Sequence, residues 1–439
     1  MTGKGNVDVN TLIIYKNMSA YNDLFYDIAD LINSVIDEDN NENHLLNLAY
    51  KCGNELIEFS EHYGFEGNLY HAFLGFILAS NENAFSMACE MNDKKDGSIN
   101  QVAIHDFLIF KKLFEFDFDR IDKALGSDIS AIICDYKAYS DTGKVFNKRI
   151  RDRILELTKN LEEAEDIASF YKSVTLFYRE YGVGKFGLNK AFRIKENKDS
   201  SYSIIPITSI EHIYLNDLIG YELQKKKLIE NTKAFIEGKK ANNVLLFGDS
   251  GTGKSSSVKA ILNEFFTDGL RVIEVYKYQF EALSEIIETI KDRNYKFIIY
   301  MDDLSFESFE IEYKYLKAII EGGLGKKPDN VLIYASSNRR HLVKEMNSDN
   351  NGADGDLHHN DTIQEKLSLV ARFGITIYYP SLEAKEYKHV VDELAKKYNL
   401  DIEKEKLYNE AMKWEMRHGG LTGRTARQFI DYLIGVENK

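Results

Sequence analysis

A run of glycine, lysine and serine residues near the middle of the chain has the composition of a phosphate-binding loop. The run GDSGTGKS consists of Gly248, Asp249, Ser250, Gly251, Thr252, Gly253, Lys254 and Ser255. The strand-like VLLFG precedes it and the helix-like SSSVKAILNEFF continues from it, which is the context such a loop requires. Glycines let main-chain amides approach phosphates, a lysine reaches the β and γ phosphates, and a serine hydroxyl binds magnesium. The motif therefore predicts a site for ATP and Mg²⁺, with Lys254 on the phosphates and Ser255 on the metal.

Two adjacent carboxylates follow a second apolar run. The segment FIIYMDD carries Asp302 and Asp303 where a buried strand would end, and ligands bind at the carboxyl ends of strands in open parallel sheets. We expect Asp302 to hold magnesium through water and Asp303 to act as the base that orients the attacking water. Glu307 is the alternative base, and a solvated strand end is the alternative without chemistry.

A third apolar run, VLIYASS, brings an amide to the same edge of the predicted sheet. Asn338 follows this run directly, and its side chain could align the attacking water against the γ phosphate. An asparagine after a strand is often only a turn residue. Its order in the chain, after the phosphate loop and the paired aspartates, favours the catalytic interpretation.

Strand-like and helix-like segments alternate in the second part of the chain, and these elements must position the groups above. The alternation predicts an α/β fold in which helices flank a parallel sheet. The five strand-like runs cover residues 244–248, 271–275, 296–301, 330–336 and 374–379. After the second run, the alternating aromatic residues Tyr276, Tyr278 and Phe280 predict an extension of that strand packed on the core.

The first part of the chain has a different pattern. Its apolar residues recur at helical spacing, with no proline before Pro206, which predicts an all-α domain over residues 1–185. Glycines and polar turn residues predict a linker or small hairpin over 186–206. An α/β nucleotide-binding domain would then occupy 207–383, and helical runs fill 384–439.

Together these segments resemble an AAA+ ATPase. GDSGTGKS corresponds to Walker A, FIIYMDD to Walker B and Asn338 to sensor 1, and the RF pair at Arg372 and Phe373 and the late segment GRTAR also match. From about residue 205 to about 435 the chain is similar to a bacterial AAA+ family known only as a domain of unknown function, through runs such as MDDLSFE, EGGL and EKLSLVARFG. The resemblance implies an AAA+ P-loop core with a five-stranded parallel sheet, a C-terminal α-helical lid, and a nucleotide-dependent homo-oligomer in a ring or arc. One departure is Asp303, where many AAA+ proteins have glutamate.

The resemblance also assigns arginines to the nucleotide. Arg372 stands where AAA+ rings place an arginine finger that reaches the neighbouring subunit's γ phosphate. Arg339 and Arg340 compete for that role. Arg424 is the candidate sensor 2, with Arg427 as its competitor, and a surface salt bridge is the alternative for either of these two lid arginines.

Two further features follow from the same resemblance. In LNDLIGYE, Ile219 and Tyr221 correspond to the segment that packs on adenine, although core packing explains such residues nearly as well. Tyr276, Tyr278 and Phe280 lie where some AAA+ rings have an aromatic pore loop that grips a polypeptide. The strand extension described above is the preferred interpretation of these three aromatic residues.

Charge and composition limit the range of partners. The formal net charge is −14, and the first hundred residues hold 5 Lys and Arg against 16 Asp and Glu. An acidic surface repels phosphate backbones, so the charge argues against nucleic acid as a ligand, and we expect the helical domain to recognise a protein partner. Without a run of roughly 20 apolar residues or a signal-peptide pattern, we expect a cytoplasmic protein that does not enter a membrane.

The residues and the resemblance together imply an AAA+ ATPase. It would hydrolyse Mg-ATP to ADP and phosphate and couple that reaction to remodelling of a protein partner. A slow nucleotide-gated switch or scaffold is the alternative. A nucleic-acid loader is a third interpretation, which would need a basic face.

Overall fold

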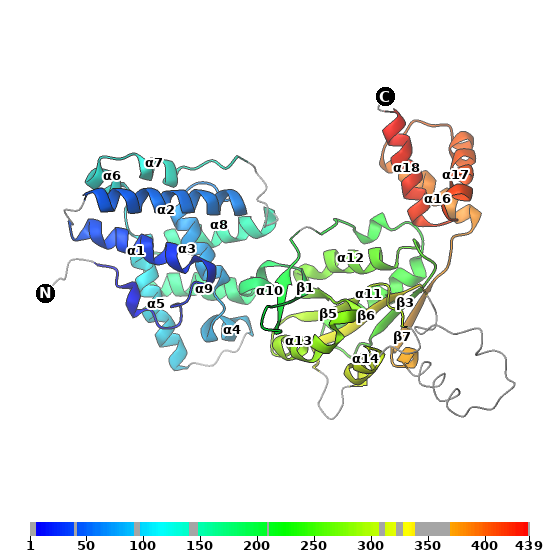
Figure 1. The fold of residues 1–439 in the computed structure, drawn as a ribbon, viewed down its shortest axis with the longest axis horizontal. Coiled ribbons are helices and arrows are strands. Elements are labelled where there is room, and N and C mark those ends of the chain that lie inside the picture. Colours follow the sequence, from blue (N-terminus) through cyan, green and yellow to red (C-terminus); the bar gives the residue numbers. More distant parts are fainter. Residues whose placement is uncertain are drawn as a thin grey trace. The chain divides into compact units, whose positions relative to one another are not determined.

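The computed structural model describes residues 6–38, 42–91, 97–139, 148–208, 210–306, 312–321, 328–338 and 369–437. The chain divides into two compact units, Met1–Asn189 and Lys190–Lys439 (Figure 1). Each unit has a hydrophobic core of its own.

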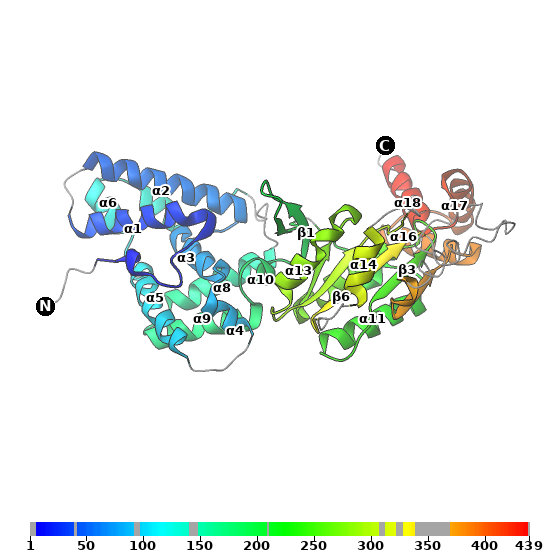
Figure 2. The same ribbon diagram turned by 60° about the horizontal axis from the view of Figure 1, so that its bottom comes forward.

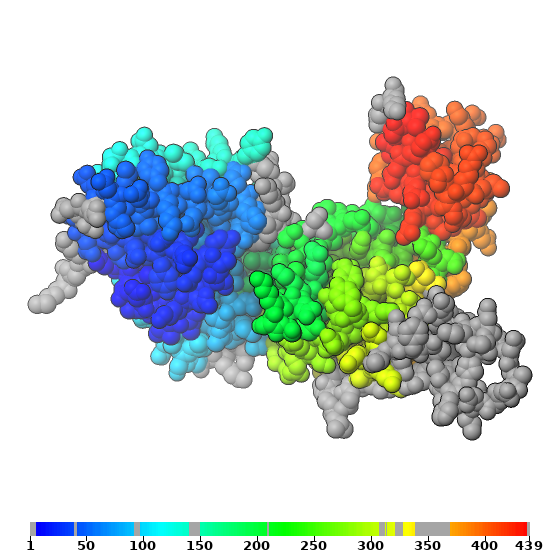
Figure 3. All heavy atoms as spheres, in the orientation of Figure 1, coloured from blue at the N-terminus to red at the C-terminus, as the bar shows by residue number. Residues whose placement is uncertain are grey.

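The first unit is built from helices, which close into one compact body in the space-filling view (Figure 3, blue to cyan). Two short 3₁₀ helices, η1 (Val9–Thr11) and η2 (Ser19–Tyr21), precede the α-helices. The α-helices are α1 (Asn22–Ile36), α2 (Glu42–Tyr63), α3 (Leu69–Ser80), α4 (Ala84–Glu90), α5 (Ser98–Phe114), α6 (Asp119–Leu125), α7 (Ile129–Cys134), α8 (Lys148–Glu162), α9 (Ile167–Tyr181) and α10 (Gly184–Leu188).

Helical periodicity explains how these helices pack. In α1 the apolar residues recur every three or four positions, and Leu24, Ile28 and Val35 are all buried. Helix α3 is buried on nearly all sides instead, which is typical of a central helix. At Gly75 of α3 a Cβ atom would lie 2.1 Å from the Thr158 hydroxyl of α8, so the glycine is what allows these two helices to approach so closely.

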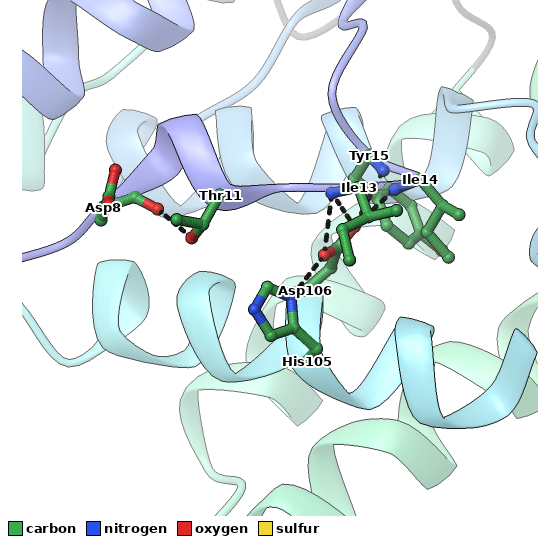
Figure 4. Close-up of polar contacts among 7 residues, drawn as sticks. All are labelled: Asp8, Thr11, Ile13, Ile14, Tyr15, His105 and Asp106. Carbon is green, nitrogen blue, oxygen red and sulfur yellow. Dashed lines mark hydrogen bonds and ion pairs between the residues drawn. The ribbon is translucent and has the colours of Figure 1, made fainter. Parts of the chain in front are cut away.

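A buried carboxylate fastens the segment before α1 to helix α5. Asp106 is 0% exposed, and its oxygens accept main-chain N–H groups from Ile13 at 3.1 Å, Ile14 at 2.8 Å and Tyr15 at 3.0 Å (Figure 4). The Nδ1 atom of His105 lies 3.0 Å from the same carboxylate. Since a buried carboxylate is tolerated only when it is well hydrogen-bonded, these contacts fix the path of the N-terminal segment.

The second unit is built on a seven-stranded sheet with the order β2-β1-β4-β5-β6-β3-β7. Strands β1 and β2 are antiparallel, and every other neighbouring pair is parallel. The strands are β1 (Ala191–Glu196), β2 (Tyr202–Pro206), β3 (Val244–Gly248), β4 (Leu270–Glu274), β5 (Lys296–Met301), β6 (Val331–Ser337) and β7 (Ile375–Tyr379). The α/β fold class predicted from the sequence is confirmed, and the five predicted parallel strands form the part β4-β5-β6-β3-β7.

Two details of the sheet differ from the sequence-based expectation. The segment 186–206 does not merely link two domains, because its hairpin joins the sheet through a parallel pairing in which Phe192 lies opposite Ile273. The predicted strand extension through Tyr276, Tyr278 and Phe280 is wrong. Strand β4 ends at Glu274 and a 3₁₀ helix, η5 (Lys277–Ala282), follows; Phe280 is buried while Tyr276 and Tyr278 are exposed.

Helices cover both faces of this sheet. Helices α11 (Glu222–Ile236) and α12 (Lys254–Phe265) pack on one face, and α13 (Leu283–Ile290) and α14 (Glu312–Glu321) lie on the other (α12 in Figure 1; α11, α13 and α14 in Figure 2). Two short 3₁₀ helices, η3 (Leu215–Asp217) and η4 (Phe266–Asp268), contact α12. Strand β3 lies between β6 and β7, so the loop that follows it emerges from the interior of the sheet.

The last three helices form a small group with its own apolar cluster. They are α16 (Ala384–Lys397), α17 (Lys404–His418) and α18 (Gly423–Glu437). Ile219 and Tyr221, from the segment before α11, pack against this cluster. Over the described residues, no helix combines the length and the apolarity needed to cross a bilayer.

Candidate functional site

The loop between β3 and α12 has a backbone that only glycines adopt readily. Gly248 has φ of +140°, and a Cβ atom there would lie 2.0 Å from the main-chain oxygen of Tyr379 in β7. Gly251 and Gly253 have φ of +79° and +94°, in the left-handed region where other residues are strained. The loop therefore curls tightly, and its main-chain amides lead into the amide-rich start of α12.

Lys254 is the first residue of α12 and lies inside the loop. It is 6% exposed, and its Nζ donates to the main-chain oxygens of Gly248 at 2.9 Å and Asp249 at 2.7 Å and to Oδ1 of Asn338 at 3.0 Å. Burial lowers the pKa of the Lys254 ammonium, and the nearby carboxylates of Asp249, Asp303 and Asp302 oppose that effect. A cation in a cradle of amides is well placed to bind an anion such as phosphate.

The first of the paired aspartates receives several hydroxyl groups. The Oδ1 atom of Asp302 accepts hydrogen bonds from Ser255 Oγ at 2.7 Å, from Tyr300 OH at 2.7 Å and from Ser336 Oγ at 2.5 Å. Burial by itself would raise the pKa of the Asp302 carboxyl, but the hydrogen bonds from Ser336, Ser255 and Tyr300 outweigh it and hold the pKa below its usual value. Asp302 is therefore ionised at neutral pH.

The second aspartate lies on a strained turn. Asp303 has φ of +50°, which is uncommon for a residue with a side chain, and its N–H donates to Ser336 Oγ at 3.0 Å. Its Oδ1 accepts a hydrogen bond from Asn338 Nδ2 at 2.6 Å. Because Oδ1 of Asn338 also accepts from Lys254, Asn338 connects the lysine of the loop to the second aspartate.

Ser255 and Asp302 offer the kind of ligands that magnesium prefers. Both are oxygen donors, and they are 2.7 Å apart. Within the described residues no group of three or more His, Cys, Asp or Glu side chains could hold a metal ion by itself. This set fits Mg²⁺, which is usually held by one or two protein groups together with phosphate oxygens and water.

A cleft of about 970 Å³ opens above these groups, a volume in the range of small-molecule sites. Its polar lining includes the loop from Ser250 to Ser255 with Asp302, Asp303, Ser336 and Asn338. Its apolar lining includes Leu218, Ile219 and Tyr221 from the core and Val390 and Leu394 from α16. The cleft can therefore hold a ligand with a charged part and a flat apolar part.

Ile219 and Tyr221, predicted to touch a base, both line this cleft. Tyr221 has φ of +58°, and its hydroxyl donates to the main-chain oxygen of Pro380 at 2.7 Å. Its ring centroid lies 5.2 Å from that of Tyr379. Tyr221 thus packs between the sheet and the last three helices.

The two competing lid arginines differ in their contacts. Arg424 lies against the loop. Its main-chain N–H donates to the main-chain oxygen of Gly251 at 3.2 Å, and its side-chain Nη1 lies 3.4 Å from Ser250 Oγ. Arg427 also lines the cleft, but its guanidinium pairs with Asp431 at 3.0 Å and lies over the Tyr398 ring, 5.0 Å from its centroid. These contacts favour Arg424 as the group that meets a bound phosphate.

Arg372 lies apart from the other predicted residues. It is half-buried and precedes β7, at the amino end of the strand, whereas the phosphate loop follows the carboxyl end of the parallel strand β3. It does not line the cleft. The competing residues Glu307, Arg339 and Arg340 lie outside the described residues.

Sequence reasoning missed three side chains that contact the predicted groups. Tyr300 and Ser336 donate to Asp302, and the Ser381 hydroxyl donates to Asp249 Oδ2 at 2.7 Å. The alternation of side chains in a strand gave a signal for two of them, because Tyr300 precedes Asp302 by two positions and Ser336 precedes Asn338 by two positions. A hydroxyl two residues before a functional residue at a strand end points to the same face.

Comparison with known proteins gives one long match and several partial ones. The model of a family described as "Protein of unknown function (DUF815)" matches residues 188–437. The replication factor C large subunit of Methanococcus vannielii is 33% identical over 75 residues, which are 17% of this chain and 15% of that protein. The corresponding subunit of Methanococcus maripaludis is 32% identical over 75 residues, which are 17% of this chain and 16% of that protein.

Solved structures match over about half of the chain. A Thermotoga maritima RuvB variant aligns with a TM-score of 0.35 and 19% identity, covering 51% of this chain and 66% of its own. The FIGL-1 AAA domain in complex with ADP aligns with a TM-score of 0.35 and 18% identity, covering 50% of this chain and 72% of its own.

Proposed function

We propose that this chain, which belongs to the AAA+ family described as "Protein of unknown function (DUF815)", binds ATP with magnesium and hydrolyses it to ADP and phosphate. The observation that carries the proposal is the meeting of Lys254, Asp302 and Asn338 at the carboxyl edge of the sheet, beside a loop of main-chain amides. Each of these groups comes from a different parallel strand or the loop after it, so the fold itself brings them together.

The phosphates would lie in the loop of residues 248–255. Lys254 would exchange some of its hydrogen bonds to loop oxygens for bonds to the β and γ phosphates, and Arg424, already against the loop, would contact the γ phosphate. Ser255 and Asp302 would hold the magnesium, which neutralises charge that develops on the phosphates. The adenine base of ATP would lie among the apolar residues of the cleft, between Ile219 and Leu394.

Asp303 and Asn338 would prepare the attacking water. The carboxylate of Asp303 would accept a proton from the water, and the amide of Asn338, 2.6 Å from that carboxylate, would orient both. Asp303 is shorter than the glutamate common at this position, and its left-handed backbone sets where the shorter carboxylate lies.

The active form would be a homo-oligomer, a ring or an arc. Arg372 lies outside its own chain's cleft, which supports a role in which its guanidinium reaches the γ phosphate bound by a neighbouring subunit. The acidic helical unit would recognise a protein partner that ATP turnover remodels, in the cytoplasm. The net charge of −14 does not favour a nucleic-acid loader.

A slow nucleotide-gated switch is the second candidate function. It is favoured by the hydrogen bond from Asn338 that already occupies one oxygen of Asp303, because that oxygen is then less accessible to an attacking water. In that case ATP occupancy, rather than rapid turnover, would control the partner.

Phosphate release by the purified full chain tests the proposal. We expect release that requires both ATP and Mg²⁺ and that disappears in Lys254→Ala. Binding of Mg-ATP without measurable release would support the switch instead, and the absence of both binding and release would contradict the proposed function.

A further inference from the structure

Two hydroxyl groups that the proposed reaction does not use converge on the paired aspartates. Tyr300 is on β5 and is 5% exposed, and Ser336 is on β6 and is 2% exposed. The register pairs Met301 with Ala335, so Asp302 and Ser336 follow as neighbours at the ends of the two strands. Neither hydroxyl belongs to the phosphate loop.

Ser336 binds three consecutive residues after β5. Its Oγ donates to Asp302 Oδ1 at 2.5 Å and accepts the N–H of Asp303 at 3.0 Å, and its main-chain oxygen accepts the N–H of Leu304 at 2.7 Å. The turn that these contacts hold includes the left-handed Asp303, with φ of +50°. A conformation that a residue with a side chain seldom adopts persists only where its surroundings fix it.

Tyr300 completes the arrangement from the other side. Its hydroxyl donates to Asp302 Oδ1 at 2.7 Å. Three hydroxyls therefore meet on one oxygen of Asp302, those of Tyr300, Ser336 and Ser255.

This crowding leaves the two carboxylate oxygens of Asp302 in different situations. Oδ1 receives all of the carboxylate's hydrogen bonds within the described part of the chain, and Oδ2 receives none there. Asp302 lines the cleft. A carboxylate fixed through one oxygen presents the other in a defined direction, which is how hydrogen bonds around a metal ligand orient it.

We propose that Ser336 and Tyr300 are positioning residues that fix the Asp302 carboxylate for the magnesium of the bound nucleotide, and that Ser336 also fixes the turn carrying Asp303. The proposal rests on the proposed function. It adds that the hydroxyls of Ser336 and Tyr300 determine how strongly nucleotide binding depends on Mg²⁺. It assigns these hydroxyls no contact with ATP itself.

The test compares nucleotide binding with and without the metal. Tyr300→Phe and Ser336→Ala each remove one hydroxyl, and Tyr334→Phe is the matched control, because Tyr334 is also buried on β6 but its hydroxyl bonds to Asn231 and Thr232, away from the aspartates. Calorimetry of the full chain would measure the affinity for ATP with Mg²⁺ and for ATP with EDTA. Phosphate release would give kcat and the Mg²⁺ concentration for half-maximal rate.

We expect Tyr300→Phe and Ser336→Ala to bind Mg-ATP about tenfold more weakly, the usual effect of removing a hydrogen bond to a metal ligand, and to bind ATP in EDTA like the parent. The half-maximal Mg²⁺ concentration should rise, and kcat should fall further in Ser336→Ala than in Tyr300→Phe. In Tyr334→Phe, the ratio of the affinity for ATP with Mg²⁺ to the affinity for ATP with EDTA should equal that of the parent, even if the variant melts at a lower temperature. An unchanged ratio in Tyr300→Phe, which is the least disruptive variant, would overturn the inference. Failure of the parent chain itself to bind Mg-ATP would instead overturn the proposed function.

Discussion

Asn338 donates a hydrogen bond from Nδ2 to Oδ1 of Asp303 at 2.6 Å. Its own Oδ1 accepts one from Lys254 Nζ at 3.0 Å. The amide thus joins the residue proposed to bind phosphate to the residue proposed to activate water. A change at the γ phosphate that moves Lys254 would therefore also move Asp303, through the side chain of Asn338 alone.

Changing Asp303 to Asn removes the proposed base with little change of shape. We expect turnover to fall by about a hundredfold or more, the usual contribution of a general base, while Mg-ATP affinity stays close to that of the parent. Phosphate release and calorimetry on the same preparation measure the two quantities. If turnover were unchanged, the base would have to be another residue, and Glu307 is the first candidate.

Arg424 and Arg427 form a matched pair one turn apart on α18. Arg424→Ala should lower kcat about tenfold, because its side chain lies against the loop next to Ser250. Arg427→Ala should have a smaller effect, since its guanidinium pairs with Asp431 within the same helix. Steady-state kinetics on both variants make the comparison, and a larger loss in Arg427→Ala would reverse the assignment.

The role proposed for Arg372 predicts complementation between subunits. Arg372→Ala and Lys254→Ala should each be inactive alone. When the two are mixed, some interfaces join an intact Arg372 to a cleft with an intact Lys254, and part of the turnover should return. Phosphate release across a series of mixing ratios measures this recovery. If the two variants associate but their mixture releases no more phosphate than the two variants do separately, Arg372 does not act between subunits.

Asp106 predicts a stability effect far from the cleft. Asp106→Ala would leave the buried N–H group of Tyr15 and the partly buried N–H groups of Ile13 and Ile14 without their acceptor, and an unsatisfied buried group costs about 1–3 kcal/mol. We expect a destabilisation of the helical unit by about 3 kcal/mol or more, seen as a lower melting temperature. His105→Ala is the control, because His105 is nearly half exposed and should change the melting temperature little. Equal melting temperatures for Asp106→Ala and the parent would contradict the role of this carboxylate.

The parts of the fold that the sequence predicts are those with local signals. Apolar runs identify β3 and β5 with the bounds that the structure shows, and the glycines at 248, 251 and 253 mark the loop between β3 and α12 because its backbone needs them. The pairing of β1 with β4 joins segments far apart in the chain, so no local pattern predicts it. The aromatic run after β4 alternates as a strand would, yet the chain turns into η5, where Gln279 accepts the N–H of Tyr276 through its side chain.

The same distinction applies to the candidate site. Asp302 and Asn338 stand out because polar side chains follow apolar runs, and Lys254 stands out because it follows the glycine-rich loop. Tyr300 and Ser336 carry only a weak signal, their position two residues before Asp302 and Asn338, because tyrosine and serine also occur in buried strands without any polar role. In the helical unit, the sequence does not predict the buried Asp106 either, because a single aspartate in an amphipathic helix is expected to face water.

The central claim is that the loop ending in Lys254 binds the phosphates of Mg-ATP, and a calorimetric titration tests it most directly. The parent chain should bind Mg-ATP with a measurable heat, and Lys254→Ala should bind it at least about tenfold more weakly, as expected for loss of a hydrogen bond to a charged group. Lys226→Ala, which removes an exposed lysine of α11, should bind like the parent. No heat of binding with the parent chain, or equal affinity for the parent and Lys254→Ala, would contradict the claim.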